Sequence, residues 1–96
     1  MFRHIVLYTL REDQKKQAEE MCRRFLTMKE YIPQIREIEA GVDREHTARS
    51  CDVALSILFQ TREDYLDYRQ HPYHREEVAP FVHSIVQTAV SCDFEV

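Results

Sequence analysis

The sequence predicts a domain of the α+β class, with the element order β-α-β-β-α-β of a ferredoxin-like sheet. Three observations support this prediction. The chain has 96 residues, which is the length of one domain. Its apolar residues switch between the period of a strand and the period of a helix in that order. With right-handed crossovers the first and third strands form the central pair, and these are the two runs that are apolar on both faces.

The first half of the chain contains two predicted strands around one helix. Residues 2–10 are almost continuously apolar and rich in β-forming residues, so we expect the first strand there. Within residues 14–31 the apolar side chains recur every three or four positions, which predicts an amphipathic helix. Asp13 is the expected N-cap, and Pro33 should end the helix. Residues 35–43 alternate apolar side chains with glutamates, as in a strand near a sheet edge.

The second half begins with a polar turn over residues 44–51. Residues 53–59 are apolar apart from one serine, which predicts a strand that is covered on both faces. Thr61 and Asp64 form a capping box that opens a second helix over residues 62–70.

Prolines divide the helical region that follows. His71-Pro72 interrupts the second helix, and a bent helical stretch is expected over residues 72–86. Pro80 divides that stretch, because proline fits the first turn of a helix but not its interior. Residues 87–96 alternate again and form the fourth predicted strand.

Charge and cysteine content exclude several classes of protein. The net charge is −4, with 13 basic and 17 acidic residues, which argues against a nucleic-acid or anionic-membrane surface. The first apolar run is too short for a signal peptide or a membrane span. Cys22, Cys51 and Cys92 do not have the spacing of a zinc motif or a disulfide framework. We therefore expect a cytoplasmic protein without a cofactor.

The apolar pattern also predicts a partner. Two helices cover only one face of a four-stranded sheet, yet Ile5 and Leu7 lie on the face opposite to other apolar residues of their strand. The chain has no further element to cover that face, so we expect a homodimer whose sheets pack face to face. The alternative is a monomer whose sheet face is less polar than usual.

The stretch Tyr68-x-x-His71-Pro72-x-His74 is the candidate site. His74 has the chemistry of a general base near neutral pH, and Tyr68 that of a donor to a developing oxyanion. His4 is expected to point into the same cavity, and His71 is a further candidate ligand-binding residue.

Structural roles for the same residues remain open at this point. The ring of His71 would cap free backbone groups, Tyr68 would be a packing residue, and His4 a hydrogen-bonded core histidine. A three-histidine metal site of His4, His71 and His74 is a further alternative, although no carboxylate or cysteine completes it.

The motifs RHIVLYTL, YRQHPYH and CDFEV, at the start, centre and end of the chain, resemble the stress-responsive dimeric α/β-barrel (Dabb) family. The resemblance covers the whole chain and implies a ferredoxin-like homodimer with a central barrel. One plant member is a polyketide cyclase that performs an aldol condensation. The resemblance to it implies that His74 and Tyr68 act in acid–base chemistry and that His4 lies at the same site. A cavity tyrosine of that cyclase is replaced by Phe25 here.

Three functions remain as hypotheses. The first is a homodimer that binds a small, partly apolar molecule with a carbonyl or aromatic group between sheet and helices, with cyclase-like chemistry. The second is a non-enzymatic stress-related or assembly protein with structural histidines. The third is a haem- or oxygen-handling protein, which requires an axial histidine over an open apolar pocket.

Overall fold

The computed structural model describes all 96 residues and has one antiparallel sheet with the strand order β2-β3-β1-β4. The strands are β1 (Phe2–Leu10), β2 (Ile35–Val42), β3 (Val53–Phe59) and β4 (Val86–Glu95). The predicted ferredoxin-like order is confirmed, with β1 and β3 at the centre. The two edge strands are the more polar ones, because each has at least one face in water.

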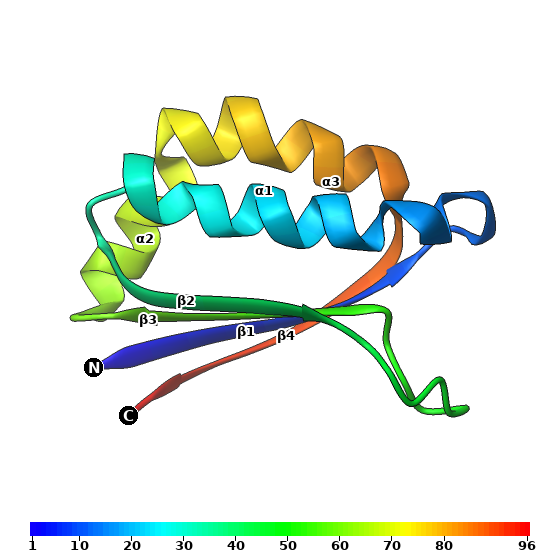
Figure 1. The fold of residues 1–96 in the computed structure, drawn as a ribbon. Helices are drawn as coiled ribbons and strands as arrows, with labels where there is room; N and C mark the ends of the chain where they lie inside the picture. The colour runs from blue at the N-terminus through cyan, green and yellow to red at the C-terminus, as the bar shows by residue number, and fades with distance from the viewer.

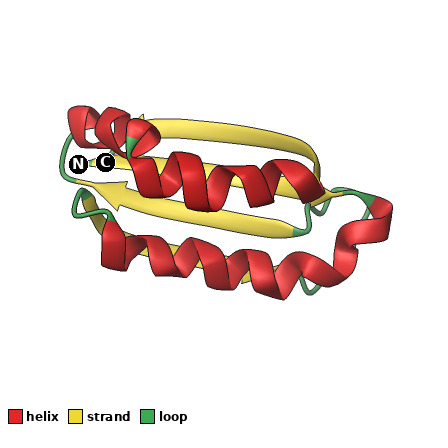
Figure 2. Ribbon diagram, turned by 90° about the horizontal axis from the view of Figure 1, so that it is seen from above, coloured by secondary structure: helices red, strands yellow, loops and turns green.

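All helices cover one face of this sheet (Figures 1 and 2). A 3₁₀ segment, η1 (Glu12–Gln17), leads into α1 (Ala18–Tyr31). After β3 come α2 (Arg62–Gln70), a π-helical segment η2 (Tyr73–Val78) and α3 (Ala79–Ile85). Helix α1 packs over β2. Segment η2 and helix α3 lie beside α1, on the side toward β4 (Figure 2).

One expected helix cap is wrong. Asp13 lies inside the first turn of η1, which begins one residue earlier and has Arg11 at its N-cap, without a side-chain hydrogen bond. An acidic residue in this first turn still interacts favourably with the helix dipole. At the other end the prediction holds: Ile32, directly before Pro33, has an extended backbone and ends α1.

The capping and proline signals in the second half are confirmed. The Thr61 hydroxyl accepts a hydrogen bond of 3.1 Å from the backbone N–H of Asp64. His71, before Pro72, has an extended backbone and separates α2 from η2. Pro80 lies in the first turn of α3, where its missing N–H costs no helical hydrogen bond. The bend expected within residues 72–86 is therefore a π-helical segment followed by a short α-helix.

The core lies between the sheet and the helices and contains no charged or strongly polar residue. Its largest fully buried side chains are Phe59, Leu10, Met21, Met28, Ile32, Leu55, Ile57 and Val53. The opposite face of the sheet has no cover within the chain (Figure 1). On it Leu7, Val90 and Phe94 remain 40%, 64% and 42% exposed, so large apolar side chains face water in the single chain.

Candidate functional site

The pairing of β1 with β4 places a carboxylate beside the first-strand histidine. His4 pairs directly with Asp93, and both side chains point to the helix-covered side of the sheet. The Nδ1 atom of His4 lies 2.5 Å from Oδ1 of Asp93. An ionised carboxylate can only accept, so Nδ1 of His4 carries the shared proton. In the neutral ring Nε2 is then left as an acceptor.

Aromatic side chains of α2 pack over His4. The Tyr65 ring lies 4.9 Å from the His4 ring, and the Tyr68 ring lies 5.9 Å from it. The two tyrosines are three positions apart, which places both on the helix face that meets the sheet. The hydroxyl of Tyr65 donates to Oδ2 of Asp93 at 3.5 Å. The carboxylate of Asp93 is thus held between a strand and a helix.

His74 reaches the same cluster from η2. Its ring centre lies 4.6 Å from that of Tyr68. Its Nδ1 atom is buried and has no hydrogen-bond partner. Burial lowers the pKa of His74, while a backbone hydrogen bond at Arg69 acts in the opposite direction. His74 is therefore a neutral imidazole near pH 7 with one unsatisfied nitrogen, a condition that costs about 1–3 kcal/mol.

The phenol between the two imidazoles is protonated. Burial raises the pKa of Tyr68 far above its usual value, and the side chain is only 2% exposed. Burial has the same effect on the pKa of Tyr8, which packs against Phe25 with a ring separation of 5.4 Å. Tyr68 is therefore a hydrogen-bond donor at neutral pH and not a phenolate.

The structure brings three of the four predicted site residues together. His4, Tyr68 and His74 share the aromatic contacts described above, whereas the Nδ1 atom of His71 accepts a hydrogen bond of 3.1 Å from the backbone N–H of Tyr73. His71 thus performs the capping role that was its structural alternative. Sequence reasoning missed Asp93 as a site residue. The alternation of the last strand places Asp93 on the helix-facing side of the sheet. The register between β1 and β4 then sets it opposite His4.

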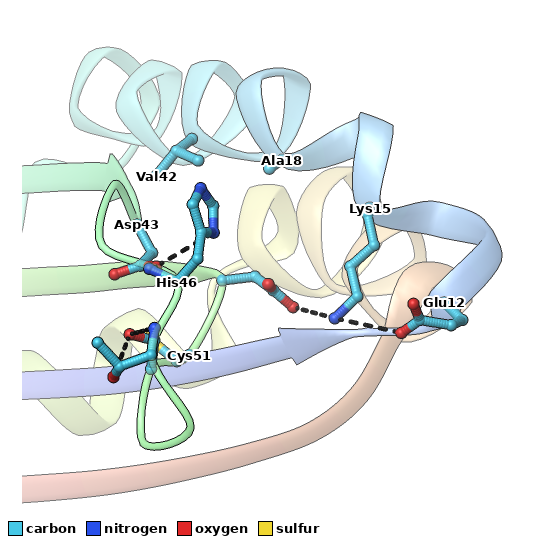
Figure 3. A pocket seen from close by; sticks show the side chains of 10 residues that line it. Glu12, Lys15, Ala18, Val42, Asp43, His46 and Cys51 are labelled. Carbon is cyan, nitrogen blue, oxygen red and sulfur yellow. Dashed lines mark hydrogen bonds and ion pairs between the residues drawn. The ribbon is translucent and has the colours of Figure 1, made fainter.

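The larger hollows of the single chain lie away from this cluster. None of five hollows with volumes of about 190 to 430 Å³ is lined by His4, Tyr68 or His74. A hollow of about 430 Å³ lies between η1 and the loop from β2 to β3 (Figure 3).

The carboxylates that line this hollow are hydrogen-bonded to Lys15 and to backbone N–H groups. The carboxylate of Asp52 accepts hydrogen bonds of 2.7 Å from the backbone N–H of Leu10 and 2.8 Å from Nζ of Lys15. The pKa of Asp52 is lowered: burial raises it, but the hydrogen bonds from Lys15 and Leu10 outweigh that effect. The carboxylate of Asp43 accepts from the backbone N–H of His46 at 2.7 Å, where His46 has a φ of 53°. The contact of Asp52 with Lys15 joins the loop to η1 (Figure 3).

Two further properties of the chain bear on its function. No three histidine, cysteine or acidic side chains come together in an arrangement suited to a metal ion, so the three-histidine alternative does not form. None of the helices combines the length and the apolar character that a membrane crossing requires.

Comparison with known proteins gives a family match over almost the whole chain. The model of the stress-responsive A/B barrel domain (Dabb) family matches residues 2–96. A stress-response A/B barrel domain-containing protein of Arabidopsis thaliana is 26% identical over 98 residues, which cover 99% of this chain and 86% of the relative.

Solved structures with the same fold include proteins of different activity. A dimeric protein of unknown function from Bacteroides fragilis, with a ferredoxin-like fold, matches at a TM-score of 0.87 and 23% identity, covering 99% of this chain and 95% of its own. The hydroxynitrile lyase of Passiflora edulis matches at a TM-score of 0.84 and 19% identity, covering 99% and 92%. At these identities the likeness shows the fold alone.

Proposed function

This chain belongs to the stress-responsive A/B barrel domain family, and from that premise we propose that it is a homodimer that binds a small carbonyl-containing or aromatic molecule at His4, Tyr68 and His74. The three unpaired cysteines favour a reducing, cytoplasmic location. The proposal has two parts, a ligand site between sheet and helices and a dimer through the uncovered sheet face.

The unpartnered Nδ1 of His74 is the observation that carries the ligand site. Buried polar atoms in proteins are almost always hydrogen-bonded, so an unsatisfied ring nitrogen suggests that a polar group of a bound molecule belongs beside it. Tyr68, 4.6 Å away between ring centres, adds a hydroxyl, and its largely buried ring provides an apolar surface. A molecule with one polar oxygen and an apolar or aromatic body matches these groups.

The route to this site is from the β4 edge. Nine of the ten residues of β4 are exposed, including those on the helix-facing side of the sheet. The Asp93 side chain is 27% exposed and the His4 side chain 11%, so the cluster meets solvent at this edge. A small shift of Tyr65 or Tyr68 opens the packed rings to a ligand from there.

The chemistry that these groups support is proton abstraction next to a carbonyl. Neutral His74 takes a proton from the carbon α to the carbonyl, and the hydroxyl of Tyr68 donates a hydrogen bond to the enolate oxygen that forms. His4, held by Asp93, orients the polar end of the substrate. An intramolecular aldol step of the cyclase type requires these roles and no metal ion.

Dimerisation through the open sheet face is supported by Leu7, Val90 and Phe94. Large exposed side chains gathered on one face are typical of an interaction surface. The Bacteroides fragilis structure with the same fold is described as dimeric, which is consistent with this part of the proposal.

A thermal-shift screen tests the ligand site. Small aromatic aldehydes and β-diketones are expected to raise the melting temperature of the wild-type protein, and His74→Ala should remove that response. His83→Ala is the matched control, because His83 is exposed on α3. A ligand response that survives unchanged in His74→Ala would discard the site assignment.

One observation favours a non-enzymatic function instead. The rings of His4, Tyr68 and His74 are packed against one another, and none of the pronounced hollows of the single chain reaches them. If the protein acts as a stress-related assembly module, the histidines are structural. In that case no member of the ligand screen shifts the melting temperature, and His74→Ala changes stability alone.

A further inference from the structure

We propose that Tyr8 forms the far end of the ligand site and donates a hydrogen bond to a second oxygen of the bound molecule. The ligand class is thereby narrowed to elongated carbonyl compounds that carry a further neutral oxygen acceptor. This inference rests on the ligand site proposed above. It adds a specificity-determining residue to the acid–base pair of His74 and Tyr68.

Tyr8 lies on the same side of β1 as His4. The two residues are four positions apart, and side chains alternate along a strand, so both point toward the helices. At about 3.3 Å per residue their Cα atoms are about 13 Å apart. Val6 lies between them on the same side and is buried. The stretch from His4 to Tyr8 therefore provides a floor long enough for an elongated molecule.

The ring of Tyr8 is held against the core. Its centre lies 5.4 Å from that of Phe25 on α1, with an angle of 29° between the ring planes. Phe25 is only 2% exposed, so this contact fixes the position of the phenol. A polar group that leaves water without a hydrogen bond costs free energy, and phenylalanine would fill the same space without that cost. The hydroxyl of Tyr8 therefore needs a role outside the packing of the core.

No other residue of the chain engages this hydroxyl. Burial alone raises the pKa of Tyr8, without a contribution from a hydrogen bond or a charge. Burial is also the main reason for the raised pKa of Tyr68, followed by the phenols of Tyr8 and Tyr65. Because the effect of one charge on another falls with distance, Tyr8 and Tyr68 lie near each other. Two protonated phenols thus lie close to the unpartnered Nδ1 of His74.

Strand β4 leaves the site open along one side. Ala89 pairs with Tyr8, and Ser91 pairs with Val6. Paired residues of neighbouring strands point to the same face, so both lie on the helix-facing side of the sheet. Both side chains are small and exposed. A ligand that enters from this edge can therefore lie along β1, with one end at His4 and the other at Tyr8.

The Tyr8 end of the site fits a neutral acceptor better than a carboxylate. No charged residue acts on the pKa of Tyr8, so an ionised group would be buried there without a counter-charge, which is unfavourable. A phenol that stays protonated donates to a carbonyl, ether or hydroxyl oxygen. With the reacting carbonyl at His74 and Tyr68, the ligand is a compound such as a diketone or a keto ester.

Two ligands of nearly the same shape test the role of Tyr8. para-Diacetylbenzene carries a second carbonyl oxygen, which para-isopropylacetophenone lacks. Calorimetric titration of wild type should show that the diketone binds about fivefold or more tightly, the effect of one neutral hydrogen bond. Tyr8→Phe should bind the two compounds within about twofold of each other, because it deletes only the donor. Tyr31→Phe is the matched control on the exposed side of α1 and should keep the wild-type preference.

The outcomes separate this inference from its premise. Equal binding of both compounds by wild type, or a preference that survives in Tyr8→Phe, overturns the role of Tyr8 while the ligand site stands. Binding of neither compound by wild type overturns the ligand site as well. Tyr8→Phe should melt at or above the wild-type temperature, since no residue loses a partner. A clearly lower melting temperature would mean that the hydroxyl serves the fold, and would also overturn the inference.

Discussion

Burial of His74 should make the stability of this protein depend on pH. Burial lowers the pKa of His74 in the folded state, whereas the unfolded chain has a histidine pKa near ~6.5. Below pH 6.5 the His74 side chain binds a proton more readily in the unfolded state than in the folded state. The stability contributed by neutral His74 is therefore complete above about pH 6.5 and is lost as the pH falls toward the folded-state pKa.

The magnitude follows from the linkage relation. One group can contribute at most about 1.4 kcal/mol per pH unit, and the unfolded chain binds the proton of His74 mainly below about pH 6.5. Between pH 7.5 and 5.5 only about one pH unit counts, so the ceiling for His74 is about 1.4 kcal/mol. Because the pKa of His74 is lowered in the folded state, stability should fall over this range, by less than the ceiling.

Urea unfolding at pH 7.5, 6.5 and 5.5 measures this loss. Wild type is compared with His74→Phe, which keeps a planar ring in the aromatic cluster but cannot titrate, and with His83→Phe at an exposed position. Protein concentration is held fixed, because the stability of a dimer depends on it. Stability should fall less steeply in His74→Phe than in the other two. Equal pH dependence in all three proteins would refute the assignment of His74 as a buried neutral base.

Three further predictions concern single contacts. Asp52→Ala removes the acceptor of a backbone N–H on β1 and of Lys15, and should lower the unfolding free energy by about 2 kcal/mol in urea titrations, with a smaller loss in Asp52→Asn. A loss under about 0.5 kcal/mol in Asp52→Ala would contradict this account. Thr61→Ala removes the N-cap of α2 and should cost about 1 kcal/mol in the same assay, whereas an unchanged midpoint would mean that the cap is dispensable. Nitrogen chemical shifts at pH 8 should show the His4 proton on Nδ1, and Asp93→Ala should give a mixture of tautomers; a wild-type tautomer in the variant would argue against control by Asp93.

The periodicity of the sequence was sufficient to predict the sheet and its strand order. Runs that are apolar on both faces became the central strands β1 and β3, because only central positions need cover on both sides. The capping residue Thr61 and the three prolines marked true boundaries, since their effects on the backbone are local. Asp13 failed as a cap because helix initiation shifted by one residue into a 3₁₀ turn.

The site was predictable only in part. Spacing within one segment suggested that Tyr68 and His74 meet, and the structure brings their rings together. The role of Asp93 depends on the register between β1 and β4, which is a long-range property that a local pattern does not contain. His71 shares the motif, but the extended backbone before Pro72 turns its ring to the next backbone N–H and away from the cluster.

Light scattering coupled to size-exclusion chromatography at micromolar concentration tests the central claim most directly. A sheet face that exposes Leu7, Val90 and Phe94 should be covered by a second copy, so the measured mass should be that of two chains. A stable, monodisperse species with the mass of one chain would contradict the account, because the apolar face would then be tolerated in water.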